Sequence, residues 1–501
     1  MCTYLIGIDL GTQGTKTCLY TQEGHLVNSA FEASNLIMPG PGRVEQDPDE
    51  LYGSVMRTIS EVMEKSGIPP ESVAAVGMDG QMAGIMGIDQ QFQAVTPYDS
   101  WLDTQCEGEI ARMKAQAGDQ VTRITGGPVT YAHGPKILWW KNERPEIYKQ
   151  IRKFVLPSTY ICGRMCGLSA DEAYIDHTCL HFSGFADIQA LKWSEELLRE
   201  FDVRPDKLPE IVSPWKIVGH LTPTSAAQCG LKAGTPVCAG AGDQAATSLG
   251  AGIVRPGLAF DVAGTASVFS CCTRAYAPDV QHRTLLYARS ILPDLWIPLA
   301  YINGGGLCVR WIRDILAGTD PNVSYDALAK EAESLPPGSE SLLFIPHFSG
   351  RVCPNDPDVR GSFLGLTMRH GRAHLYRAVL ESIGYEYLQY YRILSQNTAL
   401  CLDEVYCIGG GAKSRLYTQI KADILNLRYT TLDASDTGSW GAAIVAGHGV
   451  GLFPSMAQTA ERALTKRETL SPDPERHRAY AHCANLYPKA IPALHALYRE
   501  L

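Results

Sequence analysis

Alternating apolar and polar stretches near the start of the chain predict a run of short strands. Apolar residues cluster at Tyr4–Ile8, Thr17–Tyr20 and His25–Ala33, and runs of this length and composition are typical of strands. Gln22-Glu23-Gly24 separates the second run from the third and suits a tight hairpin turn. Residues 1–35 therefore predict a β-meander.

The next element has the signals of an amphipathic helix. Asp47 is a capping acid, Pro48 suits the first helical position, and Glu50 is the third residue after the cap. Apolar residues then recur at helical spacing, and Gly67 provides a stop. Together these features predict a helix that begins after Asp47 and ends before Gly67, with one apolar face.

Further apolar runs predict buried strands that lead into polar loops. Val73–Met78 runs into Asp79-Gly80-Gln81-Met82, a later strand leads into Trp101-Leu102-Asp103, and Pro236–Ala241 leads towards Asp243. Since α/β proteins bind ligands at strand ends, these loops are candidate binding segments. Residues 106–220 lie between them and are rich in predicted helix.

The second half of the chain starts a new set of strands after Arg255-Pro256-Gly257. Strands are predicted at Leu258–Val262, Val268–Cys272 and Glu404–Ile408, and helices at roughly 304–317, 370–396, 413–426 and 438–449. A chain of 501 residues is too long for one core, so two domains are expected. We expect the first domain at 1–247 and the second at 248–501.

Composition excludes several classes of protein. Hydrophobic residues make up 45% of the chain and charged residues 19%, which is ordinary for a globular protein. The net charge of −9 and the lack of a basic run argue against nucleic acid and membrane as partners. The start of the chain shows no signal stretch, so a cytoplasmic location is expected. The 15 cysteines show no zinc spacing and are interpreted as reduced core residues.

Two glycine-containing turns, one in each half, suggest polyphosphate binding. Asp9-Leu10-Gly11-Thr12-Gln13-Gly14-Thr15-Lys16 follows the first strand, and Asp261-Val262-Ala263-Gly264-Thr265 occurs in the second half. Glycine lets backbone N–H groups approach an anion closely. The first turn is not a P-loop, because Thr15 rather than glycine precedes Lys16. Either turn alone could be an ordinary hairpin.

A third glycine segment imitates a dinucleotide-binding motif. Gly240-Ala241-Gly242-Asp243-Gln244-Ala245 fits G-x-G-x-x-A, but it lies in mid-chain and carries an acid inside the loop. The dinucleotide motif belongs in the first strand–helix unit, with an acid about 20 residues further on. An oxidoreductase is therefore the least favoured interpretation.

Candidate chemistry falls on three segments. Asp9, beside the first turn, could hold Mg²⁺ together with phosphate oxygens. Asp243 could take the proton of a substrate hydroxyl, although an acid before a helix is more often a helix cap. Gly409-Gly410-Gly411 precedes a helix and could admit a nucleoside or phosphate, or form only a tight turn.

Two groups of segments are distinctive: Gly361-Ser362-Phe363-Leu364-Gly365-Leu366 with the segment from His374 to Glu381, and the segment from Lys136 to Glu143. They resemble the C-terminal and N-terminal signatures of the FGGY carbohydrate kinases, with departures at His133 and Trp140. Gly80-Gln81-Met82 and the segment from Ile345 to Arg351 are most similar to the xylulokinase branch. The resemblance implies an α/β fold of two lobes, actin/hexokinase-like (ribonuclease H-like), with a sugar-binding lobe at 1–247, a nucleotide-binding lobe at 248–501 and ATP in the interlobe cleft.

The resemblance also implies roles for individual residues. It makes Asp243 the catalytic base and Asp9 the Mg²⁺-associated acid. The residues implied to bind ATP are Gly11, Thr12, Gln13, Lys16, Gly264, Thr265, Gly306, Gly410, Gly411 and Ser414. Those implied to bind the sugar are Gln81, Met82, Trp101, Asp103, Asp243 and Gln244. Ala83 and Gln105 depart from the branch, which usually has His and Arg there.

The expected activity is transfer of the γ-phosphate of ATP to a ketopentose hydroxyl, D-xylulose first, with Mg²⁺ as cofactor. A kinase of the same fold acting on gluconate, ribulose or glycerol is the main alternative. A non-sugar ATPase and a catalytically silent sugar sensor are two further possibilities. The expected partners are the small sugar and ATP or ADP. The oligomeric state is open, with a homodimer as one option.

Overall fold

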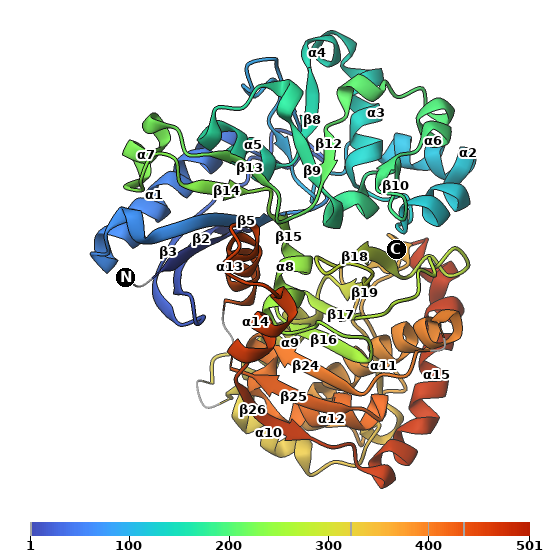
Figure 1. The fold of residues 1–501 in the computed structure, drawn as a ribbon. Helices are drawn as coiled ribbons and strands as arrows, with labels where there is room; N and C mark the ends of the chain where they lie inside the picture. Colours follow the sequence, from blue (N-terminus) through green and yellow to red (C-terminus); the bar gives the residue numbers. More distant parts are fainter. Residues whose placement is uncertain (1–2, 321–322, 399, 434–435) are drawn as a thin grey trace. The chain divides into compact units, whose positions relative to one another are not determined.

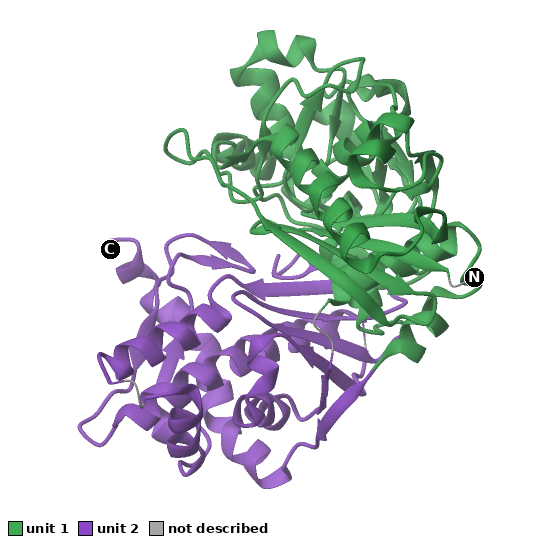
Figure 2. Ribbon diagram, turned by 90° about the vertical axis from the view of Figure 1, so that its left-hand side faces the viewer, with its two compact units in different colours: residues 1–254, 287–296, 436–464 green, residues 255–286, 297–435, 465–501 purple. Residues whose placement is uncertain are grey.

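The computed structural model describes residues 3–320, 323–398, 400–433 and 436–501 (Figure 1). These residues form two compact units, coloured separately in Figure 2. Unit 1 contains residues 1–254, 287–296 and 436–464, and unit 2 contains residues 255–286, 297–435 and 465–501. Within the described residues, every helix is too short or too polar to span a bilayer.

Unit 1 is built on a mixed sheet with the strand order β13-β14-β5-β1-β2-β3, to which β15 adds beside β5. Strands β1, β2 and β3 form the predicted antiparallel meander, and β5 pairs with β1 in parallel. The bounds are β1 Tyr4–Leu10, β2 Gly14–Thr21, β3 Leu26–Ala33, β5 Val73–Gly80, β13 Ile217–His220, β14 Pro236–Cys238 and β15 Ala241–Gly242. The meander prediction is confirmed.

The predicted first helix is α1, Pro48–Ser66. The Asp47 side chain accepts hydrogen bonds from the backbone N–H groups of Asp49 and Glu50, as the sequence signals indicate. Gly67 ends the helix in the left-handed conformation, with φ 63°. The apolar face of α1 is buried against β2 and β3.

Helix α13, Thr437–Gly449, packs on the central strands of unit 1 with its backbone unusually close to theirs. A Cβ atom at Gly7 of β1 would lie 1.8 Å from the Ser439 carbonyl oxygen, and one at Gly77 of β5 would lie 2.1 Å from that of Ala442. On its other side, α13 contacts α8, Asp243–Gly250, through Gly441. Glycines therefore let the backbones of two sheet strands and two helices meet directly.

The predicted strand Pro236–Ala241 is divided in two. Gly240 adopts φ 82° between β14 and β15, and a Cβ atom there would lie 2.0 Å from the Met78 carbonyl oxygen. A Cβ atom at Gly242 would lie 2.4 Å from the Met82 methyl group. These close approaches within the protein explain the glycines that imitate a dinucleotide-binding motif.

The helix-rich part of unit 1 packs around a second hydrophobic cluster. Trp140 is buried in it and donates its indole N–H to Asp99 at 2.5 Å, which agrees with a packing role. The short strands of unit 1 outside the main sheet are β4 Glu45–Gln46, β6 Met86–Ile88, β7 Tyr98–Asp99, β8 Lys153–Val155, β9 Tyr174–Asp176, β10 Ala186–Asp187, β11 Lys192–Trp193 and β12 Glu210–Val212. The other helices of unit 1 are α2 Glu107–Thr125, α3 His133–Glu143, α4 Pro145–Gln150, α5 Pro157–Cys166, α6 Glu195–Glu200, α7 Pro223–Cys229 and α14 Met456–Ala463.

A second mixed sheet has the strand order β18-β19-β17-β16-β24-β25-β26. Its strands are β16 Leu258–Ala263, β17 Ser267–Cys271, β18 Leu286–Arg289, β19 Trp296–Ile302, β24 Glu404–Ile408, β25 Arg428–Leu432 and β26 Lys466–Leu470. The helices of unit 2 are α9 Gly305–Ala317, α10 Tyr325–Glu333, α11 Arg372–Thr398, α12 Arg415–Leu425 and α15 Pro474–Tyr498. The remaining strands are β20 Leu343–Ile345, β21 Arg351–Val352, β22 Asn355–Asp356 and β23 Ser362–Leu364. The strands and helices predicted for this half are all present, with small shifts of their ends.

Candidate active site

Three carboxyl groups converge in unit 1. Asp9 lies near the end of β1, and Asp79 is its direct partner on the parallel strand β5. Asp243 is the first residue of α8, which follows β15 beside the same end of β5. Two of the three were predicted site residues, while Asp79 was seen only as part of a polar loop. Its position at the end of a buried strand, like that of Asp9, was the available signal.

The carboxyl groups of Asp9 and Asp79 face the N-terminus of α13. A Cβ atom at Gly438 would lie 3.2 Å from Asp79 Oδ2 and 3.5 Å from Asp9 Oδ2, with the Thr247 hydroxyl at 3.3 Å. A side chain at position 438 would therefore crowd this group. The free N–H groups and positive dipole end of a helix favour negative charge nearby. The start of α13 thus suits both these acids and an added anion.

Burial and mutual repulsion raise the pKa values of these three acids. Burial, and then the charge of Asp9, raise the pKa of Asp243 to about 7. Burial raises the pKa of Asp79 well above its usual range, with Asp9 and Asp243 adding to the effect. Burial also raises the pKa of Asp9. A carboxylate whose pKa lies near 7 is matched to proton transfer at neutral pH.

The helix-cap interpretation of Asp243 does not hold. Gly242 occupies the cap position of α8 and Asp243 is already helical. The Asp243 side chain accepts one hydrogen bond, at 2.6 Å, from the backbone N–H of Gln244. Asp243 is only half-buried, so one oxygen remains able to accept a substrate proton.

The first glycine turn is ordered by bonds within unit 1. The Gly11 N–H donates to the Gly14 carbonyl at 3.0 Å, and the Gln13 carbonyl accepts from Ser34. The Lys16 ammonium forms an ion pair with Asp436, which precedes α13. Lys16 is therefore engaged by a carboxylate in this structure rather than projecting freely towards a phosphate.

The residues expected to bind sugar lie in different surroundings within unit 1. Gln81 and Trp101 join the first turn, because Trp101 donates to the Thr12 hydroxyl at 2.7 Å and Thr12 donates to Gln81 at 3.2 Å. Met82 is buried, and Gln244 is half-buried beside Asp243. Asp103 is 1% exposed and accepts hydrogen bonds from the protein, so the structure places it in the wall of the unit.

The departures from the branch pattern have a structural use. Gln105 donates to Asp103 at 2.9 Å, so it supports that buried carboxylate. The His133 ring lies against the Met82 carbonyl oxygen, directly before Ala83. Burial lowers the pKa of His133 to about 4, which keeps the ring neutral. The neutral His133 ring of α3 thus contacts the backbone directly before position 83.

Unit 2 contains a cavity of about 670 Å³. The six residues of this unit that were expected to bind nucleotide all line it: Gly264, Thr265, Gly306, Gly410, Gly411 and Ser414. Ligand pockets commonly have volumes of roughly 300–1,000 Å³. The wall also carries three tyrosines and two cations: Tyr325, Tyr376, Tyr417, Arg310 and Lys413. Flat aromatic surface and positive charge suit a nucleoside phosphate.

Three glycine segments meet backbone to backbone at one side of this cavity. A Cβ atom at Gly306 would lie 2.0 Å from the Gly264 carbonyl oxygen, and one at Gly409 would lie 2.8 Å from that of Ala263. Gly409 has φ 89°, whereas a Cβ atom at Gly410 would meet no described atom within 4 Å. The triple glycine therefore has divided roles: Gly409 makes the turn and Gly410 faces open space.

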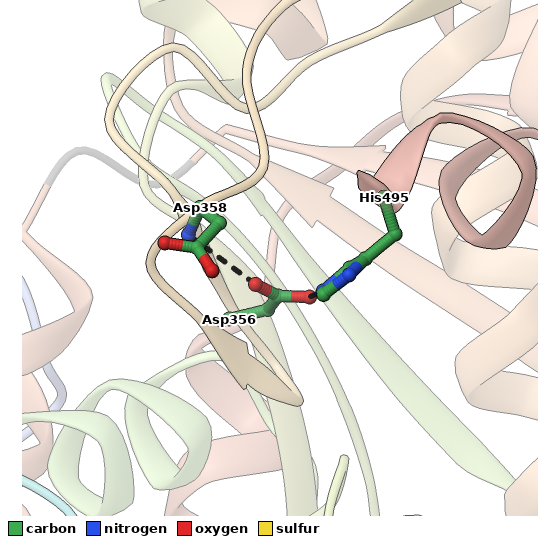
Figure 3. Close-up of side chains that lie close together, drawn as sticks. All are labelled: Asp356, Asp358 and His495. Atoms are coloured by element: carbon green, nitrogen blue, oxygen red, sulfur yellow. Dashed lines mark hydrogen bonds and ion pairs between the residues drawn. The ribbon is translucent and has the colours of Figure 1, made fainter. Parts of the chain in front are cut away.

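A separate acidic group in unit 2 was not predicted. Asp356, Asp358 and His495 offer ligand atoms within 4.8 Å of one another (Figure 3). His495 already pairs with Asp356 at 3.0 Å, and Arg499 lies 3.8 Å from Asp358. The group therefore joins the β21–β22 hairpin to α15 by charge pairing, and it stays outside the candidate site.

For Mg²⁺, Asp9 is the candidate ligand, and the donor set of unit 1 fits such an ion. Both oxygens of Asp79 are fully buried beside the Asp9 carboxyl group and form no hydrogen bond of normal geometry among the described residues. Mg²⁺ prefers carboxylate, phosphate and water oxygens. Paired carboxyl groups beside a helix N-terminus would accept the ion together with a phosphate.

Comparisons with known proteins identify the class to which this fold and site belong. The N-terminal domain model of the FGGY family of carbohydrate kinases matches residues 4–250, and its C-terminal domain model matches residues 259–450. The chain therefore belongs to the FGGY family of carbohydrate kinases. The resemblance to this family that was drawn from the sequence is confirmed.

Individual relatives carry two different substrate names. A gluconokinase of Bacillus subtilis is 30% identical over 472 residues, covering 91% of this chain and 89% of the relative. A xylulose kinase of the same organism is 30% identical over 492 residues, covering 97% of this chain and 96% of the relative. The structure of a gluconate kinase from Lactobacillus acidophilus matches with a TM-score of 0.92 at 25% identity over 100% of both chains. These matches confirm the two-domain, actin/hexokinase-like fold class and leave the sugar open.

Proposed function

We propose that this protein transfers the γ-phosphate of ATP to a hydroxyl group of a small sugar, with Mg²⁺ as cofactor. The observation that carries the proposal is Asp243, a half-buried carboxylate with a pKa of about 7 at the start of α8. Family membership supports the same assignment of reaction class. The glycine-lined cavity of unit 2 supports nucleotide binding.

In this mechanism Asp243 accepts the proton of the attacking hydroxyl. Phosphoryl transfer depends mostly on positioning and on stabilising charge, and the base removes the proton as the new bond forms. Asp9, with Asp79 beside it, would hold Mg²⁺, which would neutralise phosphate charge when bound. The turn from Gly11 to Lys16 and the turn at Gly264-Thr265 would supply N–H groups to the phosphates.

A neutral ketopentose, D-xylulose, is the substrate that we propose first. A sugar acid would need a cation for its carboxylate, but the cations adjoining the sugar-side residues are engaged. Lys136 donates to the carbonyl oxygens of Ser100 and Asp103 at 2.9 and 2.8 Å. Arg43 pairs with Glu45, and Lys16 pairs with Asp436. Gluconate is the second candidate, because gluconokinases are equally close relatives.

The test is a screen of ADP production by the purified protein with ATP and Mg²⁺. D-Xylulose, D-ribulose, gluconate, glycerol and pentitols are supplied separately, and Asp243→Asn is the matched control. We expect xylulose-dependent turnover, which Asp243→Asn should lower by roughly 10²-fold or more. Turnover of gluconate alone would overturn xylulose as the substrate and leave the proposed kinase reaction standing. Equal ADP production with and without any sugar would instead indicate an ATPase and would overturn the proposal.

A further inference from the structure

A fully buried ion pair lies beneath the cavity of unit 2. The Lys421 ammonium on α12 contacts Asp261 Oδ2 on β16, and both side chains are 0% exposed. Taking two charges out of water is costly, so such a pair often stabilises a protein no more than apolar packing of the same volume. Its presence is therefore better explained by the position that it imposes than by stability.

The pair is held in place from several sides. Asp261 Oδ1 accepts the Tyr387 hydroxyl at 2.9 Å, and Cys407 Sγ lies 3.4 Å from Oδ2. The Lys421 ammonium lies 4.2 Å from the ring centre of Tyr417 and 5.6 Å from that of Tyr429. Cations within about 6 Å of an aromatic face are attracted to it. Lys421 therefore fixes the Tyr417 ring as well as Asp261.

Both partners lie close in sequence to the glycine segments of the cavity. Asp261 is three residues before Gly264, on the same strand and turn. Lys421 is on α12, the helix that begins immediately after Ser414. The pair thus joins the strand that leads into one turn to the helix that follows another.

Tyr417 connects this pair to the ligand space. Its ring lines the cavity and is 3% exposed, and a Cβ atom at Gly411 would lie 3.0 Å from its Cε1. Its hydroxyl is buried beside Ser267, another residue of the cavity wall, and forms no hydrogen bond of normal geometry among the described residues. A buried hydroxyl that lacks a good partner is destabilising, and a hydrogen bond to a ligand oxygen would remove that cost.

We propose that Tyr417 is a nucleotide-contacting residue and that Asp261 and Lys421 are positioning residues that hold it and the two glycine turns in register. This inference rests on the proposed nucleotide binding of unit 2. Asp261 and Lys421 act through Tyr417 and the turns and need not touch the nucleotide.

The test measures ADP binding by calorimetry, separately from activity. Lys421→Met keeps much of the volume and removes the charge, and we expect ADP affinity to fall on the order of tenfold. The matched control is Arg351→Met, which breaks the buried pair of Arg351 with Glu386 in the same unit, outside the cavity lining. Both variants should lower the melting temperature, but only Lys421→Met should weaken ADP binding. In steady-state kinetics Lys421→Met should raise KM for ATP and leave KM for sugar unchanged.

A second variant keeps the test valid if Lys421→Met does not fold. Tyr417→Phe retains the ring and removes only the hydroxyl, so it should fold and bind ADP several-fold more weakly. Unchanged ADP affinity in Tyr417→Phe would overturn the contact, and unchanged affinity in folded Lys421→Met would overturn the positioning. If Arg351→Met weakened ADP binding as much as Lys421→Met, the effect would come from a general loss of stability, and the positioning role would also be overturned. A wild-type protein that binds no ADP would instead refute the proposed function.

Discussion

The pKa of Asp243 makes the catalytic proposal quantitative. If the carboxylate form is the base, kcat/KM should be proportional to the ionised fraction, because kcat/KM reports groups of the free enzyme. With a pKa of about 7, kcat/KM should rise about tenfold per pH unit below pH 6 and level off above about pH 8. Asp243→Asn should lower kcat by roughly 10²- to 10⁴-fold and abolish this dependence.

The same carboxyl group links activity to stability. Its folded pKa of about 7 is above the ordinary 3.8, so the folded state binds more protons between these two pH values. The free energy of unfolding should therefore fall as pH rises from about 4 to about 7, by at most about 4 kcal/mol from this group. Because Asn is neutral at every pH, Asp243→Asn should be more stable than the wild type at pH 8.

The assays are a pH series of coupled ADP-release kinetics and urea unfolding of both proteins at pH 5 and pH 8. Wild type and Asp243→Asn should have similar stability at pH 5 and diverge at pH 8. A flat kcat/KM profile between pH 5.5 and 8.5, or an Asp243→Asn variant within tenfold of wild-type turnover, would refute the assignment of the base. A variant less stable than wild type at pH 8 would refute the reasoning about burial.

Three other variants test the fold around the site. Gly410→Val should place its side chain in the cavity and weaken ADP binding with no loss of sugar binding. The control is Gly371→Val, which also has open space around its Cβ atom but lies outside the cavity lining and should leave ADP binding unchanged. If calorimetry gives Gly410→Val the same ADP affinity as the wild type, the triple glycine is only a turn. Gly7→Ala should cost about 3 kcal/mol or more in urea unfolding, because its Cβ atom would lie 1.8 Å from the Ser439 carbonyl oxygen. Burial alone would raise the pKa of Glu386, but the Arg351 guanidinium and the hydrogen bonds to the carboxylate outweigh burial and lower the pKa to about 2 from 4.5. Stability should therefore be lost as pH falls from about 4.5 to 2. Glu386→Gln should flatten that acid limb, and an unchanged limb would exclude Glu386 as its source.

Local signals were sufficient for most secondary structure. The acid, proline and glycine around α1 act within a few residues of one another, so the sequence shows them directly. Gly264, Gly306 and Gly410 are far apart in the chain, yet each follows a strand, and strand ends on one side of a sheet gather in space. The family resemblance supplied their roles, which the residues alone did not separate from ordinary turns.

Features that depend on register or on packing between distant segments were not visible in the sequence. Asp79 becomes notable only when β5 aligns it with Asp9. The burial of Asp103 depends on Lys136 and Gln105, which no spacing rule connects to it. Helix α13 was predicted as a helix at 438–449, but the sequence did not show which sheet it covers.

The close packing of α13 on Gly7 and Gly77 limits when unit 1 can complete its folding during synthesis on the ribosome. Strands β1 and β5 are synthesised within the first 80 residues, but the helix that covers them is encoded after residue 436. At roughly 5–20 residues per second, the early sheet waits on the order of tens of seconds for its cover. During that interval the nascent chain exposes an apolar surface that chaperones would recognise. A chain terminated before residue 436 should leave the first unit immature, although its sheet is already complete.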